Sequence, residues 1–315
     1  MTATRAPAAR APAAPAARTE TTAARDQPGP ARAPARGATL AGALAMVCVG
    51  GSVAVTGTLA RAPVYTAEAL RYAAACLLLL AFARASGRSV RLPRAAEWLW
   101  LAGIAATGLV VFNVALADGA RGAEPAVFGV AVACVPTLLA VAGPLLERSR
   151  PAPKAVVAAV VLTGGAALVQ GLGRCDAAGF AWAAVAFGCE AAFTLLAVPV
   201  LGRHGPLGVS VHATWIATVI FAVLGGVREG PAAVTRLSAA DWLATGYLAV
   251  GVTAVAFVLW YSCVRRLGAS RAGLITGVAP VAAAVIGIPV SGALPALPVW
   301  GGIVLIAAGL AAGLG

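Results

Sequence analysis

The stretch GAEPAVFGVAVACVPTLLAVAGPLLER, residues 122–148, decides how this chain can fold. Residues 125–146 carry no charged side chain, and an apolar helix of about 20 residues is long enough to cross a bilayer. A second stretch, GASRAGLITGVAPVAAAVIGIPVSG (268–292), repeats the opening Gly-Ala and the mid-helix proline, which is Pro136 in the first copy and Pro280 in the second. A short break and a helix of small residues follow each copy, so residues 122–173 and 268–315 form a repeat.

The composition of the whole chain points to the same environment. Hydrophobic residues make up 61% of the 315 residues and charged residues 11%, whereas soluble domains hold about 45–50% and about 25%. The charges are clustered, and long uncharged runs separate the clusters. The sequence therefore predicts an integral membrane protein that crosses the bilayer many times.

Ten apolar segments appear along the chain when hydropathy is read over a window of about 19 residues. They lie at residues 38–60, 64–84, 97–117, 124–146, 154–172, 177–201, 207–227, 240–263, 270–291 and 296–314. Because a repeat of five spans is odd, the second copy must enter the membrane in the opposite sense. We therefore expect an all-α fold of ten transmembrane helices in two inverted five-helix repeats, 37–173 and 174–315, a pattern typical of transporters.

The basic residues predict the orientation of these spans. Residues 1–36 hold six arginines and six prolines, which predicts a disordered tail. With this tail in the cytoplasm, 17 basic residues fall on the inner side and five on the outer side: Arg61, Arg121, Arg174, Arg228 and Arg236. Inner loops are the more basic in membrane proteins, so both termini are expected in the cytoplasm of a bacterium, below its plasma (inner) membrane. The net charge of +12 is explained in this way without a nucleic-acid partner.

Several stretches resemble a known family. They are GGSVAVTG (50–57), APVYTAEALRYAAACLLLL (62–80) and the two proline-containing stretches of the repeat. On these residues the chain resembles the EamA-type transporters of the drug/metabolite transporter superfamily. The resemblance implies secondary transport of a small molecule, often export, without ATP or another cofactor. The sequence agrees, since it contains no GxxxxGK[ST] phosphate-binding loop. Expected partners are a small-molecule substrate and membrane lipid, and the protein is expected to be a monomer or a homodimer.

Glu190 is the most unusual residue inside an apolar run, WAAVAFGCEAAFTLLAVPV (182–200). An ionisable side chain at the bilayer centre costs about 2.5–3.5 kcal/mol on insertion scales. Steps of four residues place Trp182, Glu190 and Thr194 along one stripe of a helix. Glu190 and Trp182 are therefore candidates for proton coupling or substrate binding. The structural alternative is a neutral carboxylic acid that is hydrogen-bonded to a neighbouring helix.

Three other polar groups lie at membrane depth. Glu68 and Arg71 are three residues apart, a spacing that allows an ion pair within one helix; Arg71 either attracts an anionic group of the substrate or belongs to a structural pair. Asn113 either contacts substrate or hydrogen-bonds across helices. His212 and Trp215, also three apart, lie near the cytoplasmic end of their span, where His212 either relays protons or meets interfacial water.

Proline and glycine predict where helices bend and where they approach closely. Pro136 and Pro280 are expected to kink or break helices, which transporters use for gating. Gly273 and Gly277 form a GxxxG pattern that permits close packing, either within the chain or between two copies.

Two other function classes compete with a transporter. A channel or a structural membrane subunit would share the same composition and span count. A membrane-embedded enzyme is disfavoured because the sequence has no GxSxG or HExxH motif and only two histidines. The six cysteines include no CxxC pair, so no metal site is expected.

Overall fold

The computed structural model describes residues 2, 35–56, 59, 62–146 and 148–314. The described residues from 35 onward form one compact helical unit. Nearly all of the predicted tail, 1–36, lies outside the described residues. Within the described ranges there is no strand, only one isolated bridge between Ala123 and Cys175. This confirms the all-α prediction for that part of the chain.

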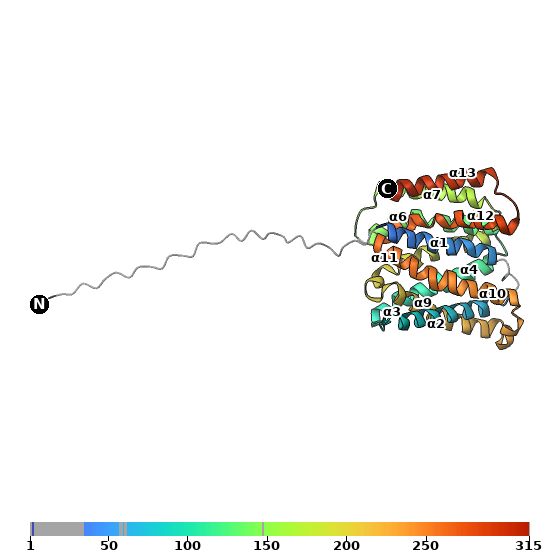
Figure 1. The fold of residues 1–315 in the computed structure, drawn as a ribbon, viewed down its shortest axis with the longest axis horizontal. Coiled ribbons are helices and arrows are strands. Elements are labelled where there is room, and N and C mark those ends of the chain that lie inside the picture. The colour runs from blue at the N-terminus through green and yellow to red at the C-terminus, as the bar shows by residue number, and fades with distance from the viewer. Residues whose placement is uncertain (1, 3–34, 57–58, 60–61, 147, 315) are drawn as a thin grey trace. The chain divides into compact units, whose positions relative to one another are not determined.

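The helices lie side by side in one bundle (Figure 1). In chain order they are α1 (Ala35–Thr56), α2 (Val64–Ala85), α3 (Ala95–Ile104), the π-helical η2 (Ala105–Val111), α4 (Phe112–Gly119), α5 (Pro125–Ala133), α6 (Val135–Leu146), α7 (Pro153–Gln170), α8 (Ala177–Leu195), α9 (Val198–Arg228), the short 3-10 helix η3 (Pro231–Arg236), α10 (Ala239–Tyr247), the π-helical η4 (Leu248–Val255), α11 (Ala256–Ile275), α12 (Val278–Ser291) and α13 (Leu297–Leu314).

Eight helical segments in the described residues are long and apolar enough to cross a membrane. Two of them contain a glycine with non-helical backbone angles, Gly205 (φ 67°) in α9 and Gly268 (φ 79°) in α11. The chain therefore changes direction inside each of these segments. The protein is thus a multi-pass membrane protein.

The two halves share the same helix irregularities. The segments 95–119 and 239–275 each begin as an α-helix and pass into a π-helical stretch, η2 or η4, after about three turns. The helix of each proline-containing stretch is also interrupted, at Cys134 between α5 and α6 and at Thr276–Gly277 between α11 and α12. Pro136 and Pro280 follow in the first turn of the next helix. Proline is tolerated there because backbone N–H groups in a first turn have no acceptor within the helix.

The two interruptions are held differently. The Thr163 hydroxyl of α7 donates to the Ala133 carbonyl (2.9 Å) and lies 3.1 Å from the Thr137 hydroxyl. In the second half the Thr276 hydroxyl donates to the Gly273 carbonyl of its own helix (2.7 Å). A neighbouring helix therefore holds the first break, whereas the second break is satisfied locally.

Glycines set the closest helix contacts. The Cβ of an alanine at Gly165 in α7 would lie 2.7 Å from the Gly302 carbonyl oxygen of α13. At Gly273 and Gly277 it would lie 2.9 Å from Leu139 and 2.8 Å from Leu162, on α6 and α7. The GxxxG pattern of 273–277 thus packs against helices of the same chain.

Glu229, just after α9, caps the N-terminus of α2. Its carboxylate accepts hydrogen bonds from the backbone N–H groups of Tyr65 (2.9 Å) and Thr66 (2.8 Å) and from the Thr66 hydroxyl (2.7 Å). The residue at the N-cap position itself, Pro63, provides no such bond. A carboxylate from the second half therefore satisfies backbone donors that would otherwise be unpaired at a helix start.

Candidate transport site

A buried ion pair lies on α2. Arg71 Nη1 is 3.2 Å from each carboxylate oxygen of Glu68, and the two residues are 8% and 7% exposed. The Arg71 Nε donates to the Thr253 hydroxyl of η4 at 2.9 Å. The sequence spacing predicted the pair, but Thr253 was not foreseen because it lies 182 residues away along the chain.

Tyr72, the next residue of α2, is linked to the other π-helical segment through Asn113 of α4. Asn113 Nδ2 donates to the Tyr72 hydroxyl at 2.9 Å and to the Leu109 carbonyl of η2 at 2.6 Å. The Tyr72 ring also stacks on Phe221 of α9, with 5.8 Å between ring centres. The structure therefore brings Glu68, Arg71 and Asn113 into one polar cluster, in which α2 contacts Asn113 of α4 in the first half and Thr253 of η4 in the second.

Glu190 lies on the inward-facing stripe of α8. Residues one turn before and after it on that stripe, Ala186 and Phe193, are buried. Its own side chain is only partly buried, and within the described part of the chain the carboxylate makes no hydrogen bond or ion pair. Its surroundings are aromatic: Phe193 packs on Tyr261 with ring centres 5.1 Å apart. An inward carboxylate without a protein partner is able to take a proton or a cationic group.

Contacts between α8 and the segment 95–119 give the depth of Glu190. A Cβ at Gly108 would lie 2.7 Å from Phe193 Cβ, and one at Gly119 would lie 2.7 Å from Trp182 Cβ. This antiparallel alignment places Asn113 opposite residue 188, so Asn113 and Glu190 differ in height by about 3 Å at 1.5 Å per residue. Glu190 therefore shares its level with the polar cluster of α2, although no hydrogen bond joins the two. Trp182 lies about two turns before Glu190, nearer the N-terminal end of α8.

His212 and Trp215 belong to a second polar group where α3 and α9 meet. Trp215 Nε1 donates to His212 Nδ1 (3.2 Å), and His212 Nε2 lies 2.9 Å from the Arg91 carbonyl. Trp98 contacts both rings edge-on. Glu97 of α3 pairs with Arg203 and lies 3.2 Å from His204 Nε2. The sequence analysis missed Glu97, Arg203 and His204, whose only signal was charge next to a helix start.

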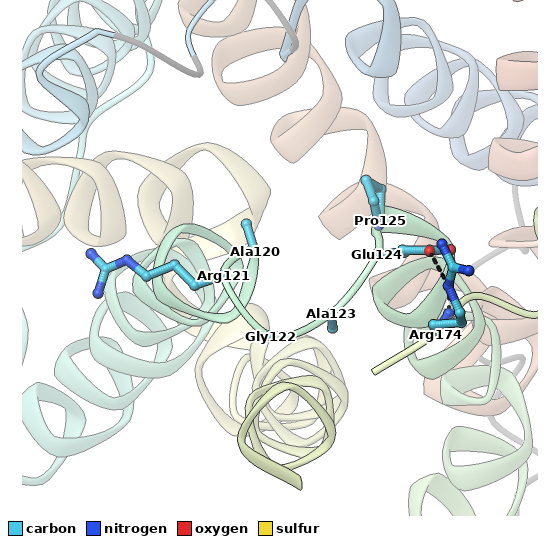
Figure 2. Close-up of a pocket in the computed structure, with 7 residues that line it drawn as sticks. All are labelled: Ala120, Arg121, Gly122, Ala123, Glu124, Pro125 and Arg174. Carbon is cyan, nitrogen blue, oxygen red and sulfur yellow. Dashed lines mark hydrogen bonds and ion pairs between the residues drawn. The ribbon is translucent and has the colours of Figure 1, made fainter. Parts of the chain in front are cut away.

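Two open recesses on the surface of the described residues lie elsewhere. One of about 350 Å³ is lined by Ala120, Arg121, Gly122, Ala123, Glu124, Pro125 and Arg174. In Figure 2 the Arg174 side chain meets Glu124, and the two are joined by a 2.9 Å ion pair, while Arg121 points away from them. A smaller recess is lined by Ala62, Pro63, Arg228, Glu229 and Arg236. Neither contains a residue that the sequence analysis selected, and no group of three potential metal ligands occurs among the described residues.

The comparisons with known proteins agree with this architecture. A family model described as "EamA-like transporter family" matches residues 36–170 and, a second time, residues 177–312. The "Uncharacterized transporter YetK" of Bacillus subtilis (strain 168) is 26% identical over 261 residues, which cover 79% of this chain and 78% of that protein. A solved structure described only as "Crystal structure of protein" has a TM-score of 0.74 at 21% identity, covers 88% of this chain and 96% of the other, and supports the fold.

The family model matches twice and covers most of the helical unit. The π-helical stretch and the interrupted helix also occur twice, once in each half. It points to a transporter with a small-molecule substrate in a membrane, not to an enzyme. The chain belongs to the EamA-like transporter family, within the drug/metabolite transporter superfamily.

Proposed function

We propose that this protein is a secondary transporter that exports a small metabolite, amino acid or drug across the bacterial inner membrane by alternating access, coupled to protons. The observation that carries the proposal is Glu190: a carboxylate on the inward stripe of α8, at the level of the polar cluster, with no partner among the described residues. Since leaving such a group unpaired is costly, we assign it a proton or a cationic group of the substrate.

The other selected residues receive supporting roles in this proposal. Arg71, balanced by Glu68 and oriented by Thr253, attracts an anionic group of the substrate. Asn113 positions Tyr72 next to Arg71 through its hydrogen bond. Trp182 covers the Glu190 face of α8 towards the outer end of the helix. His212 and Trp215 belong to the cytoplasmic end. The two helix interruptions beside Pro136 and Pro280 allow the half-helices to bend during the transport cycle.

The proposal includes ten membrane crossings. Eight segments qualify by length and apolarity; α1 and α12, with the bend at Gly268, supply the other two. The halves are residues 37–173 and 174–315, related by an inverted repeat, with both termini in the cytoplasm. The substrate pathway lies where helices of the two halves meet, as in other inverted-repeat transporters.

Transport into proteoliposomes tests the function. A growth-inhibition screen with toxic metabolites and drugs, in cells that express the protein, first identifies a substrate. We then expect saturable flux that a proton gradient drives, and loss of that drive in Glu190→Gln. Glu124→Gln is the matched control because Glu124 lies in an exposed loop. Unsaturable flux would favour a channel, and pH-dependent transport that survives in Glu190→Gln would refute the coupling role.

A further inference from the structure

His204 has an unusual environment at the end of the bundle where α9 begins. Its side chain is completely buried, and Nε2 lies 3.2 Å from a Glu97 carboxylate oxygen. Its other nitrogen, Nδ1, has no hydrogen-bond partner among the described residues. A buried polar atom without a partner costs about 1–3 kcal/mol. Packing alone would favour an apolar side chain here, so the unpaired nitrogen calls for a functional explanation.

His212, the neighbouring histidine, has no free nitrogen that could take up a proton, because both of its ring nitrogens are hydrogen-bonded. An indole N–H only donates, so His212 Nδ1 must accept from Trp215 at 3.2 Å. A carbonyl only accepts, so His212 Nε2 must donate to Arg91 at 2.9 Å. These two partners fix the neutral ring with its proton on Nε2. A second proton would break the bond with Trp215.

His204 differs in that one nitrogen is free. Since Nε2–H donates to the Glu97 carboxylate, the lone pair of Nδ1 is open to a proton. The imidazolium that forms would share the carboxylate of Glu97 with Arg203. The two histidine rings contact edge to face, with centres 5.4 Å apart, so a charge on His204 is placed directly against the neutral ring of His212.

The remaining charged groups around His204 come from several elements. Arg203, on the same segment, pairs with Glu97, and Arg91 before α3 reaches the Arg203 carbonyl at 3.5 Å. Arg265 of α11 lies 3.5 Å from where a Cβ of Gly205 would be. On α2, the Cys76 thiol faces the Val211 carbonyl of α9, and Arg84 lies in the last turn of the helix. The π-helical η2 has no charged residue. Glu97 is thus the only carboxylate in contact with His204 in the described residues.

We propose that His204, oriented by its hydrogen bond to Glu97, binds a proton on Nδ1. Binding and release of this proton control transport from the cytoplasmic side. In the arrangement that the structure shows, no acceptor among the described residues lies within reach of the added Nδ1–H. Protonation therefore favours a different arrangement of the helix, in which Nδ1 hydrogen-bonds to water. Gly205 (φ 67°) and Pro206 interrupt α9 directly after His204, so the short segment 198–204 is able to turn against the rest of α9. The control of transport rests on the proposed function, whereas the proton site itself does not.

Nuclear magnetic resonance tests the proton site directly, because the chain contains only two histidines. The protein, carrying no histidine tag, is labelled with ¹⁵N-histidine and placed in lipid nanodiscs, and His204→Gln and His212→Gln assign the signals. As the pH is lowered, we expect the ring that His204→Gln removes to gain a proton. We expect the other ring to stay neutral with its proton on Nε2. A His204 ring that stays neutral throughout, or titration of His212 instead, overturns the proposal.

Flux measurements test the control of transport separately. With the pH on both sides of the proteoliposome membrane shifted together, so that the driving proton gradient stays constant, His204→Gln and Glu97→Gln should lose the dependence of flux on pH that the unaltered protein shows. Glu190→Gln should leave the titration of the His204 ring unchanged. If no substrate is ever transported, the proposed function fails while the resonance titration still decides the proton site. If His204 titrates but His204→Gln keeps the normal pH profile of flux, the site does not control transport.

Discussion

Two ionisable groups at similar depth have opposite surroundings. Arg71 is bonded to Glu68 and Thr253 and is almost fully buried, whereas Glu190 is partly accessible and has no partner in the part of the chain that the structure describes. A buried charge is tolerated when it is paired and hydrogen-bonded. The Glu68–Arg71 pair therefore stabilises the fold in addition to any role in binding. The contacts of Glu190 show no such stabilising role.

The α2 pair makes a stability prediction at the level of single residues. Arg71→Gln leaves Glu68 buried without its cation, and such a loss destabilises by about 3–5 kcal/mol. Glu68→Gln/Arg71→Gln removes both charges and should recover most of that stability. The measurement is the free energy of unfolding of the purified protein in detergent, obtained from denaturant titration followed by tryptophan fluorescence.

Arg88→Gln is the control for this comparison, because Arg88 is exposed at the end of α2 and an exposed charge contributes little. Its unfolding free energy should match that of the unaltered protein. Equal losses in the single and double variants at Glu68 and Arg71 would contradict the prediction, since they would show that the two charges do not stabilise each other.

At this scale the sequence revealed which residues are unusual but not what they contact. Residue spacing predicted the Glu68–Arg71 pair, and hydrophobic context singled out Asn113 and Glu190. Tyr72, Thr253 and His204 were missed because their partners are distant in sequence or their residue types are common at membrane depth. Contacts such as Arg71–Thr253 depend on how the two halves pack, which spacing along one helix does not encode.

At the scale of the helices, adjacent glycines have opposite surroundings. A Cβ at Gly165 would meet the Gly302 carbonyl at 2.7 Å, while one at Gly164 would have nothing within 4 Å. Hydrophobic patterning located α7 within about two residues but could not tell which glycine faces α13. A similar limit applies to Glu229, whose role as the cap of α2 depends on a contact 163–164 residues away along the chain.

This difference predicts unequal effects of two neighbouring substitutions. Gly165→Ala must push α7 and α13 apart, and overpacking of this kind costs about 1–3 kcal/mol. Gly164→Ala adds a methyl group to open space and gains up to about 1 kcal/mol of helix propensity. Thermal unfolding of the two variants in detergent should therefore shift the midpoint in opposite directions. The contact between α7 and α13 would be wrong if Gly165→Ala were as stable as Gly164→Ala.

At the scale of the whole molecule, the two halves share their backbone but not their chemistry. Both contain a π-helical segment and an interrupted helix. The counterpart of α8 in the first half is α1, where GGS (50–52) occupies the region that corresponds to Glu190. The acid is therefore not required by the repeat itself. The repeat and the helical class could be predicted because apolar length and composition determine them, whereas the π-helical segments could not, because no residue pattern marks them.

The orientation of the whole molecule is the last prediction. If the N-terminus is cytoplasmic, the loop before α8 lies outside, and its Cys175 is the exposed cysteine among the six. A thiol reagent that cannot cross membranes should label Cys175 in intact cells, and Cys175→Ser should abolish that labelling. When Ser86→Cys is added to Cys175→Ser, labelling should occur only after the cells are permeabilised, because residue 86 is exposed in the loop after α2. The reverse pattern would invert every loop of the proposed topology and place His204 and Glu97 on the outer side.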